Sequence, residues 1–183
     1  MSAAIKPSGQ VTHVMVDIET LDTVPSAVIL SIGACLIPRT SCQFYVECDT
    51  IVGQGIRTTS QSTIDWWAEQ PSDLKPNGHT LLIDSLNMFS KWIAQLPGRP
   101  IIWAKGIDFD CAILANAYRM YNLSVPWKYN DVRDFRTLKK VFISALGDSI
   151  PENRQAHNAL ADAKYQADVL EMIIKNSPSL SLS

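Results

Sequence analysis

The sequence lacks any apolar run that approaches the roughly 20 residues needed to cross a bilayer as a helix. Its first ten residues also lack the basic cluster and apolar stretch of a secretory signal, and contain Pro7, Ser8 and Gly9 instead. We therefore expect no membrane segment and a flexible N-terminal lead over residues 1–10.

Cysteine is scarce, and its spacing argues against two kinds of site. The four cysteines form no CxxC pair, and no histidine follows them at zinc-finger spacing, which disfavours a structural zinc site and a redox dithiol. We expect reduced thiols in a cytoplasmic protein. The residues concerned are Cys35, Cys42, Cys48 and Cys111.

An excess of positive charge is also missing. The formal net charge is −2, which argues against a protein that holds nucleic acid by bulk charge but not against an enzyme that meets phosphate through bound metal ions. Basic residues still concentrate in the middle of the chain, where they can line a phosphate path; for Lys139 and Lys140 a solvated helix face is the more typical interpretation. The group comprises Lys105, Arg119, Lys128, Arg133, Arg136, Lys139 and Lys140.

Length and composition indicate one globular domain. A chain of 183 residues with 46% hydrophobic and 19% charged residues can bury one substantial core and is short for two. We place the domain at residues 11–176 and expect a frayed tail over residues 177–183.

The N-terminal part of the domain has the character of three strands. Residues 13–17 form a short buried run, residues 28–37 are rich in β-branched side chains, and residues 43–48 alternate apolar and polar side chains. Three strands in close succession predict an antiparallel meander.

The remainder alternates helical and strand patterns, which predicts an α/β fold: a mixed sheet with helices on its faces and catalytic groups at strand ends. An apolar run at residues 100–103 predicts a further strand. Apolar spacing of three and four predicts helices over residues 63–70, 81–96, 110–121 and 156–175.

Two carboxylates end the first predicted strand. Asp17 and Glu19 are two residues apart, so their side chains project from the same face and can reach one divalent cation. The triplet is not specific by itself, because acidic residues also end strands and begin turns.

A third carboxylate follows the fourth strand. Asp110 comes after a strand and a glycine, at the expected start of a helix, where the helix dipole and capping favour an acid without any catalytic role. Asp108 lies two residues earlier and competes with it as a ligand.

His157 and Asp162 stand at the start of the last predicted helix. Five helical steps of about 100° place them some 140° apart, so they share a face only if His157 lies on the entering loop or the first turn. A surface histidine beside an N-terminal acid is the alternative interpretation.

Read together and in order, these motifs resemble those of the DEDDh 3′–5′ exonucleases of the ribonuclease-H-like superfamily, which includes ribonuclease T and polymerase proofreading subunits. The resemblance spans residues 11–174 and is strongest to the small bacterial and phage exoribonuclease-like branch. It implies a mixed sheet, an antiparallel meander followed by parallel strands, with helices on both faces. Further segments that carry it are Asp17–Leu21, Ile29–Ala34, Thr63–Trp67 and Arg133–Leu138.

The resemblance also implies roles for individual residues. Four carboxylates are expected to hold two Mg²⁺ or Mn²⁺ ions, with His157 as general base; they are Asp17, Glu19, Asp110 and Asp162. Hard cations prefer such oxygen ligands, and histidine can accept a proton near neutral pH. A sister class has tyrosine four residues before the last acid, where this chain has Asn158, which favours the histidine class.

The implied substrate is a single-stranded or overhanging 3′ end, of RNA or alternatively DNA, and relatives often pair, so a homodimer is one expected state. In the family, positions equivalent to Thr20 and Leu21 lie against the terminal nucleotide; a turn and core packing are the alternative. We take Trp67 as a third substrate contact, although Trp66 and Trp67 cannot share a helix face and one of them belongs to the core. Ser31 replaces an acid that holds the terminal sugar in many relatives.

Two other functions compete with the exonuclease. A non-catalytic nucleic-acid-binding module would have no chemical need for all five side chains that the chain retains. An RNase H-type endonuclease shares the expected fold but lacks the HxAxxD arrangement that begins at His157.

Overall fold

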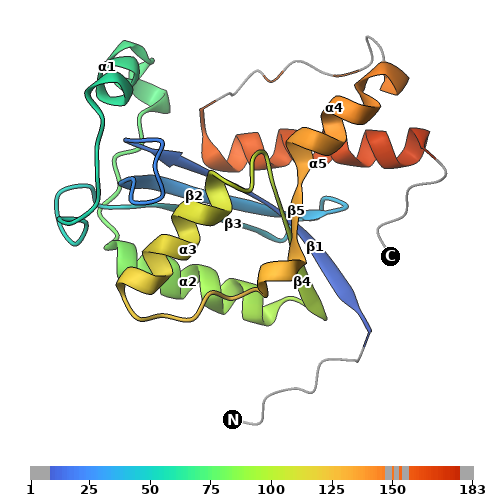
Figure 1. Ribbon diagram of the computed structural model, residues 1–183, viewed down its shortest axis with the longest axis horizontal. Coiled ribbons are helices and arrows are strands. Elements are labelled where there is room, and N and C mark those ends of the chain that lie inside the picture. Colours follow the sequence, from blue (N-terminus) through green and yellow to red (C-terminus); the bar gives the residue numbers. More distant parts are fainter. Residues whose placement is uncertain (1–8, 147–149, 151–152, 154–156, 178–183) are drawn as a thin grey trace.

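The computed structural model describes residues 9–146, 150, 153 and 157–177, so most of the expected N-terminal lead and all but Ser177 of the expected tail lie outside the described residues. Within these residues, five strands, five α-helices and two short 3₁₀ turns follow one another. Figure 1 shows how they are arranged. In chain order they are β1 (Val11–Thr20), β2 (Ile29–Ile37), β3 (Gln43–Glu47), α1 (Gln61–Glu69), η1 (Ser72–Leu74), α2 (Leu82–Gln95), β4 (Arg99–Ala104), α3 (Asp110–Met120), η2 (Tyr129–Asp131), β5 (Val132–Asp134), α4 (Phe135–Leu146) and α5 (Ala159–Asn176).

The strands form one mixed sheet in the order β3-β2-β1-β4-β5. The β1–β2 and β2–β3 pairs are antiparallel, whereas β1–β4 and β4–β5 are parallel. This confirms the predicted α/β fold with a meander followed by parallel strands. The parallel strands place the end of β1 beside the loop that follows β4, which brings two of the predicted acidic motifs to one edge.

Helices cover both faces of the sheet, as predicted (Figure 1). Alternation along β1 sends Val14, Val16 and Ile18 into a core with α2 and α3, while Met15 joins a second core with α4 and α5. The second core ends where Asp17 and Glu19 replace apolar residues on the same face of β1.

The boundaries differ from the predicted ones at functionally important points. The last helix begins at Ala159, after the Asn158 cap, rather than at residue 156, which itself lies outside the described residues. The short strand β5 has three residues and no periodic signal in the sequence. Among the described residues, no helix combines the length and the apolar character required to cross a membrane.

Candidate active site

The end of β1 presents Asp17 and Glu19 toward α5. The intervening Ile18 is buried in the opposite core, so the alternation of the strand turns both carboxylates to one face. The register with β2 shifts between Glu19 and Thr20, so an irregularity in the ladder directly follows the second acid. Local strand geometry therefore fixes the pair, as the sequence predicts.

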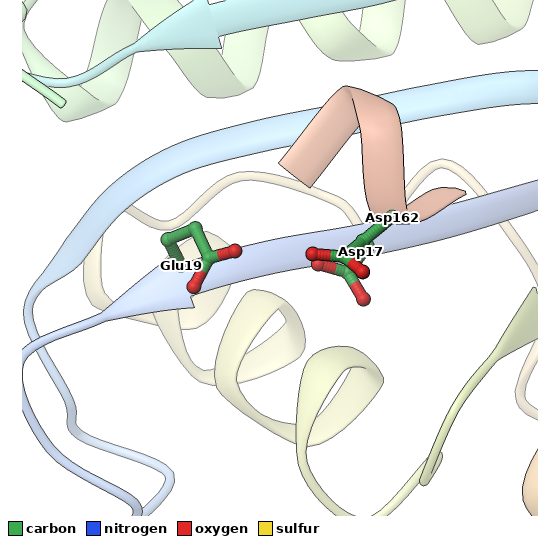
Figure 2. A group of neighbouring side chains, drawn as sticks. All are labelled: Asp17, Glu19 and Asp162. Atoms are coloured by element: carbon green, nitrogen blue, oxygen red, sulfur yellow. The ribbon is translucent and has the colours of Figure 1, made fainter. Parts of the chain in front are cut away.

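Asp162 comes to the same point from the first turn of α5. One carboxylate oxygen from each of Asp17, Glu19 and Asp162 lies within 4.8 Å of the other two. Figure 2 shows the Asp17 and Asp162 carboxylates side by side, with Glu19 further along β1. Three hard oxygen donors at this spacing form a suitable site for a divalent cation.

Asp110 approaches the cluster from the first turn of α3. Its side chain is buried, its Oδ1 accepts a hydrogen bond from the backbone N–H of Ile18 at 3.2 Å, and it lines the same cavity as the other acids. Asp108 is exposed and lies outside the cavity lining. The structure therefore gathers Asp110, and not Asp108, with Asp17 and Asp162.

His157 lies on the loop that enters α5, which removes the 140° separation expected for two residues of one helix. Its backbone has a positive φ of 72°, unusual for a residue other than glycine, and its N–H donates to Asp162 Oδ2 at 2.7 Å. Its ring lines the cavity and meets the Trp66 ring edge to face, with centroids 4.7 Å apart.

Two amide side chains outside the sequence motifs orient the carboxylates. Gln166 Nε2 donates to Asp17 Oδ1 at 2.7 Å, and Asn153 Nδ2 donates to Asp162 Oδ1 at 2.5 Å. Gln166 follows Asp162 by four residues and so shares its helix face, a signal that the sequence does contain. Asn153 lies between elements, where no periodicity points to it.

The carboxylates disfavour one another's ionisation. Burial, followed by the nearby Asp162 carboxylate, raises the pKa of Asp17 to about 8, although Gln166 and Lys105 act in the opposite direction. Burial, and then Asp17 and Asp162, raise the pKa of Glu19 to about 9. The pKa of Asp110 is also raised, by burial and by Asp17. Such a group of acids is suited to a bound cation, which would favour the ionised forms.

Basic and aromatic side chains form part of the wall of this cavity, whose volume is about 440 Å³. Arg136 donates to the backbone oxygen of Lys105 at 2.9 Å, and the Lys139 ammonium lies 5.7 Å from the centre of the Tyr165 ring. Lys139 and Lys140 therefore differ: Lys139 is half-buried at the cavity, whereas Lys140 is exposed, as expected for a solvated face. The cavity thus combines an acidic cluster with a cationic wall.

The other residues predicted to contact substrate have structural partners. Thr20 is buried and donates through its hydroxyl to the Asp22 carbonyl at 2.7 Å, and Leu21 is half-buried. Trp67 is 6% exposed and donates to the Thr20 carbonyl at 2.9 Å, so it is the core member of the tryptophan pair, and Trp66 is the exposed one beside His157. A substrate role for Thr20, Leu21 and Trp67 stays a prediction.

A family model described as the 3′–5′ exoribonuclease Rv2179c-like domain matches residues 12–174. Among solved structures, E. coli Exonuclease I in complex with a dT13 oligonucleotide matches with a TM-score of 0.67 at 14% identity, over 92% of this chain and 42% of that one. Cell-death related nuclease 4 (CRN-4) matches with a TM-score of 0.60 at 13% identity, over 91% and 64% respectively. No curated protein matches the sequence. The chain is thus shorter than both structural neighbours, and at these identities the similarity establishes the ribonuclease-H-like fold alone.

Proposed function

Because the chain belongs to the 3′–5′ exoribonuclease Rv2179c-like domain family, we propose that it is a metal-dependent exonuclease that shortens unpaired 3′ ends and releases nucleoside 5′-monophosphates. The observation that carries this proposal is the convergence of residues from β1, α3 and α5 on one cavity. The acids come from both ends of the described chain and from its middle, and His157 lies at the edge of the same cavity.

We propose that the acidic cluster binds two divalent cations, Mg²⁺ or Mn²⁺. Asp17, Glu19, Asp110 and Asp162 would hold them, because carboxylate oxygens suit hard cations. A bound cation would also offset the burial and the mutual repulsion that raise the pKa values of Asp17, Glu19 and Asp110. When bound, such ions supply positive charge to the scissile phosphate and promote ionisation of the attacking water.

The protein's own side chains then orient the carboxylates and remove a proton from the attacking water. Gln166 fixes the Asp17 carboxylate, and the His157 N–H with Asn153 fixes that of Asp162. We assign His157 as the general base: a ring nitrogen takes the proton of the water as the water oxygen bonds to phosphorus. The bond from phosphorus to the 3′ oxygen of the shortened chain breaks, which frees a nucleoside 5′-monophosphate.

A single strand suits this cavity better than a paired end. The reacting phosphate must reach carboxylates on the cavity wall, so a terminal base pair has to open first, at a cost of about 1–2 kcal/mol of stacking per step. Lys105, Arg136 and Lys139 line the same cavity and would contact the phosphates next to the reacting one. RNA is the proposed substrate because the family is described as exoribonuclease, with DNA as the alternative.

A 5′-labelled single-stranded oligonucleotide tests the activity. With Mg²⁺ we expect a descending ladder, and no cutting of a circular strand, because a circle has no 3′ end. An unchanged substrate would favour a binding module, and internal cuts or cleavage of the circle would favour the endonuclease.

Matched substrates with 3′ overhangs that differ only in the 2′-hydroxyls of the overhang test the sugar preference. We expect faster turnover of the RNA overhang, and slower turnover of a blunt duplex than of either overhang. Equal or faster turnover of the DNA overhang would assign the enzyme to DNA.

Two further features belong to this proposal. A cytoplasmic location agrees with the cysteines of the described chain, which are all free thiols. A homodimer stays a prediction, which the molar mass measured by light scattering tests.

A further inference from the structure

The backbone of His157 adopts an unusual conformation, and the residue after it is fixed from both sides. A left-handed backbone persists at a residue other than glycine only where the surroundings hold it. The Asn158 Oδ1 accepts the Ala161 N–H at 3.0 Å and so caps α5. This hydrogen bond turns the amide nitrogen of Asn158 away from α5 and toward the sheet.

That nitrogen meets a side chain of the edge strand β3. Asn158 Nδ2 donates to the Tyr45 hydroxyl at 3.4 Å, and the hydroxyl in turn donates to Glu47 Oε1 at 2.8 Å. The second carboxylate oxygen of Glu47 accepts the N–H of Asn77 at 3.0 Å. Burial and Glu47 raise the pKa of Tyr45, so its hydroxyl remains a donor. A continuous chain of hydrogen bonds therefore connects β3 to the residue that follows His157.

The first turn of α5 is also in close contact with the middle of the sheet. A Cβ atom at Gly33 would lie only 2.2 Å from the backbone nitrogen of Leu160, so β2 and the start of the helix leave no room for a side chain between them. Gly33 thus allows the short distance between the start of α5 and the sheet. The Tyr45 contact holds the start of α5 at a second point, on the side of β3. It therefore resists rotation of the helix start about its contact with Gly33.

We propose that Tyr45 is a positioning residue for His157, which it holds through the amide of Asn158. This inference rests on the proposed role of His157 as general base. Tyr45 is not among the residues that line the cavity, so it acts on the position of the base and not on the substrate.

Tyr45→Phe removes only the hydroxyl. We expect kcat to fall about tenfold, the usual order for residues that orient a reactive group, with KM changed less than twofold. Tyr121→Phe is the matched control, because it also removes a tyrosine hydroxyl, here one that donates to the Gly53 carbonyl. Tyr121 follows the C-terminal end of α3, whereas Asp110 lies at the other end, so this substitution should leave kcat unchanged. A Tyr45→Phe enzyme with the kcat of the wild type overturns the proposal.

Two further variants separate positioning from a general loss of structure. In the His157→Ala background, adding Tyr45→Phe should cause no further loss of the residual rate; an undiminished tenfold loss there would show that Tyr45 does not act through His157. Asn158→Ser keeps a capping hydroxyl but cannot reach Tyr45, so it should reproduce the kcat of Tyr45→Phe with the helix intact. A kcat equal to that of the wild type in this variant would also overturn the proposal.

Hydrogen exchange provides a measurement that does not require activity. The His157 amide, which is bonded to Asp162, should exchange about tenfold faster in Tyr45→Phe, while the amides in the middle of β1 keep their protection. Unchanged exchange at His157 overturns the proposal. If the wild-type protein cuts no nucleic acid but this difference in exchange is seen, the proposed function fails and the positioning stands.

Discussion

The two faces of the sheet use the same strand alternation for different purposes. On the side of α2 and α3, Val14, Val16 and Ile18 of β1 continue one apolar core past the level of Asp17. On the side of α4 and α5, the core that begins at Met15 gives way to Asp17 and Glu19. The first face contributes hydrophobic stabilisation over its whole length, whereas the second loses it where the cavity begins.

This contrast explains how a single sheet can hold clustered acids. Their raised pKa values show that ionising Asp17 and Glu19 opposes the folded state, and the opposing energy has to be offset elsewhere. The fully buried side chains of Leu86 and Phe89 lie on the other face of the same sheet. Stability and chemistry should therefore respond to different substitutions.

The largest expected effect is the loss of activity, without loss of stability, when one carboxylate of the cluster is replaced. Asp17→Asn or Asp110→Asn should lower turnover by more than about 10⁴-fold, because bound metal contributes several kcal/mol of charge stabilisation and each 1.36 kcal/mol is a factor of ten. The melting temperature without metal should be unchanged or higher, since a repelled charge is removed. Asp108→Asn is the control and should keep full activity; loss of activity in that variant instead would make Asp108 the ligand.

The second effect distinguishes the proposed metal ligands from the proposed general base on this polar face. His157→Ala should reduce the rate by about 10²–10⁴-fold, the usual contribution of a general base, while Mg²⁺ or Mn²⁺ binding measured by calorimetry persists. If metal binding disappears together with the ring, His157 belongs to the ligand set.

A matched pair of leucines compares the two faces directly. Leu86→Ala on α2 and Leu170→Ala on α5 each remove a fully buried side chain and should cost about 3 kcal/mol in urea unfolding. At a temperature where both variants are folded, Leu86→Ala should keep the kcat of the wild type. Leu170→Ala should not, because α5 carries Asp162 and Gln166. Equal kcat values in the two variants would contradict this separation of the faces.

A pH series without metal measures how far the acids oppose folding. Between about pH 4 and pH 9, folded Asp17 and Glu19 bind protons that the unfolded chain has released, so the stability of the metal-free protein decreases as pH rises. Both side chains keep some contact with solvent, and we expect a loss on the order of 1–2 kcal/mol, seen as a fall of about 2–8 °C in Tm. Saturating Mg²⁺ should abolish this fall in differential scanning fluorimetry. A pH-independent Tm in EDTA would contradict the raised pKa values.

The smallest effect concerns the cationic wall of the cavity. Lys139→Gln should raise KM about three- to tenfold with little change in kcat, and should reduce the slope of log KM against log salt by about one. Lys140→Gln, at the exposed neighbouring position, is the control and should leave both quantities unchanged. Equal effects of the two substitutions would mean that the lysines act through general charge rather than at the cavity.

The sequence predicts the positions of the acidic residues more completely than it predicts the residues that orient them. Period-2 alternation is sufficient to place Asp17 and Glu19 together, because a strand allows only two directions. The choice between Asp108 and Asp110 depends on the residue at which α3 begins, which capping preferences leave open. The position of His157 depends on a left-handed backbone that no periodicity shows.

Side-chain partners show the same limit. Gln166 can be found by counting one helical turn from Asp162, whereas Asn153 has no such relation to any element. Adjacent lysines look equivalent in the sequence, and only the packing of α4 beside α5 directs Lys139 to the cavity and leaves Lys140 in solvent. Sequence patterns define the direction in which each side chain leaves its helix or strand. Tertiary packing determines which residues that side chain contacts.

The hydrogen bond from Gln166 to Asp17 joins residues 149 positions apart, and this separation has a consequence for synthesis of the protein. A ribosome completes β1 early and α5 late, so a nascent chain that already has its first two acids still lacks Asp162 and the His157 loop. The proposed site is therefore incomplete until nearly all of the domain has emerged. With the proposed function, the chain would not degrade nucleic acid while it is incomplete and still attached to its own messenger RNA.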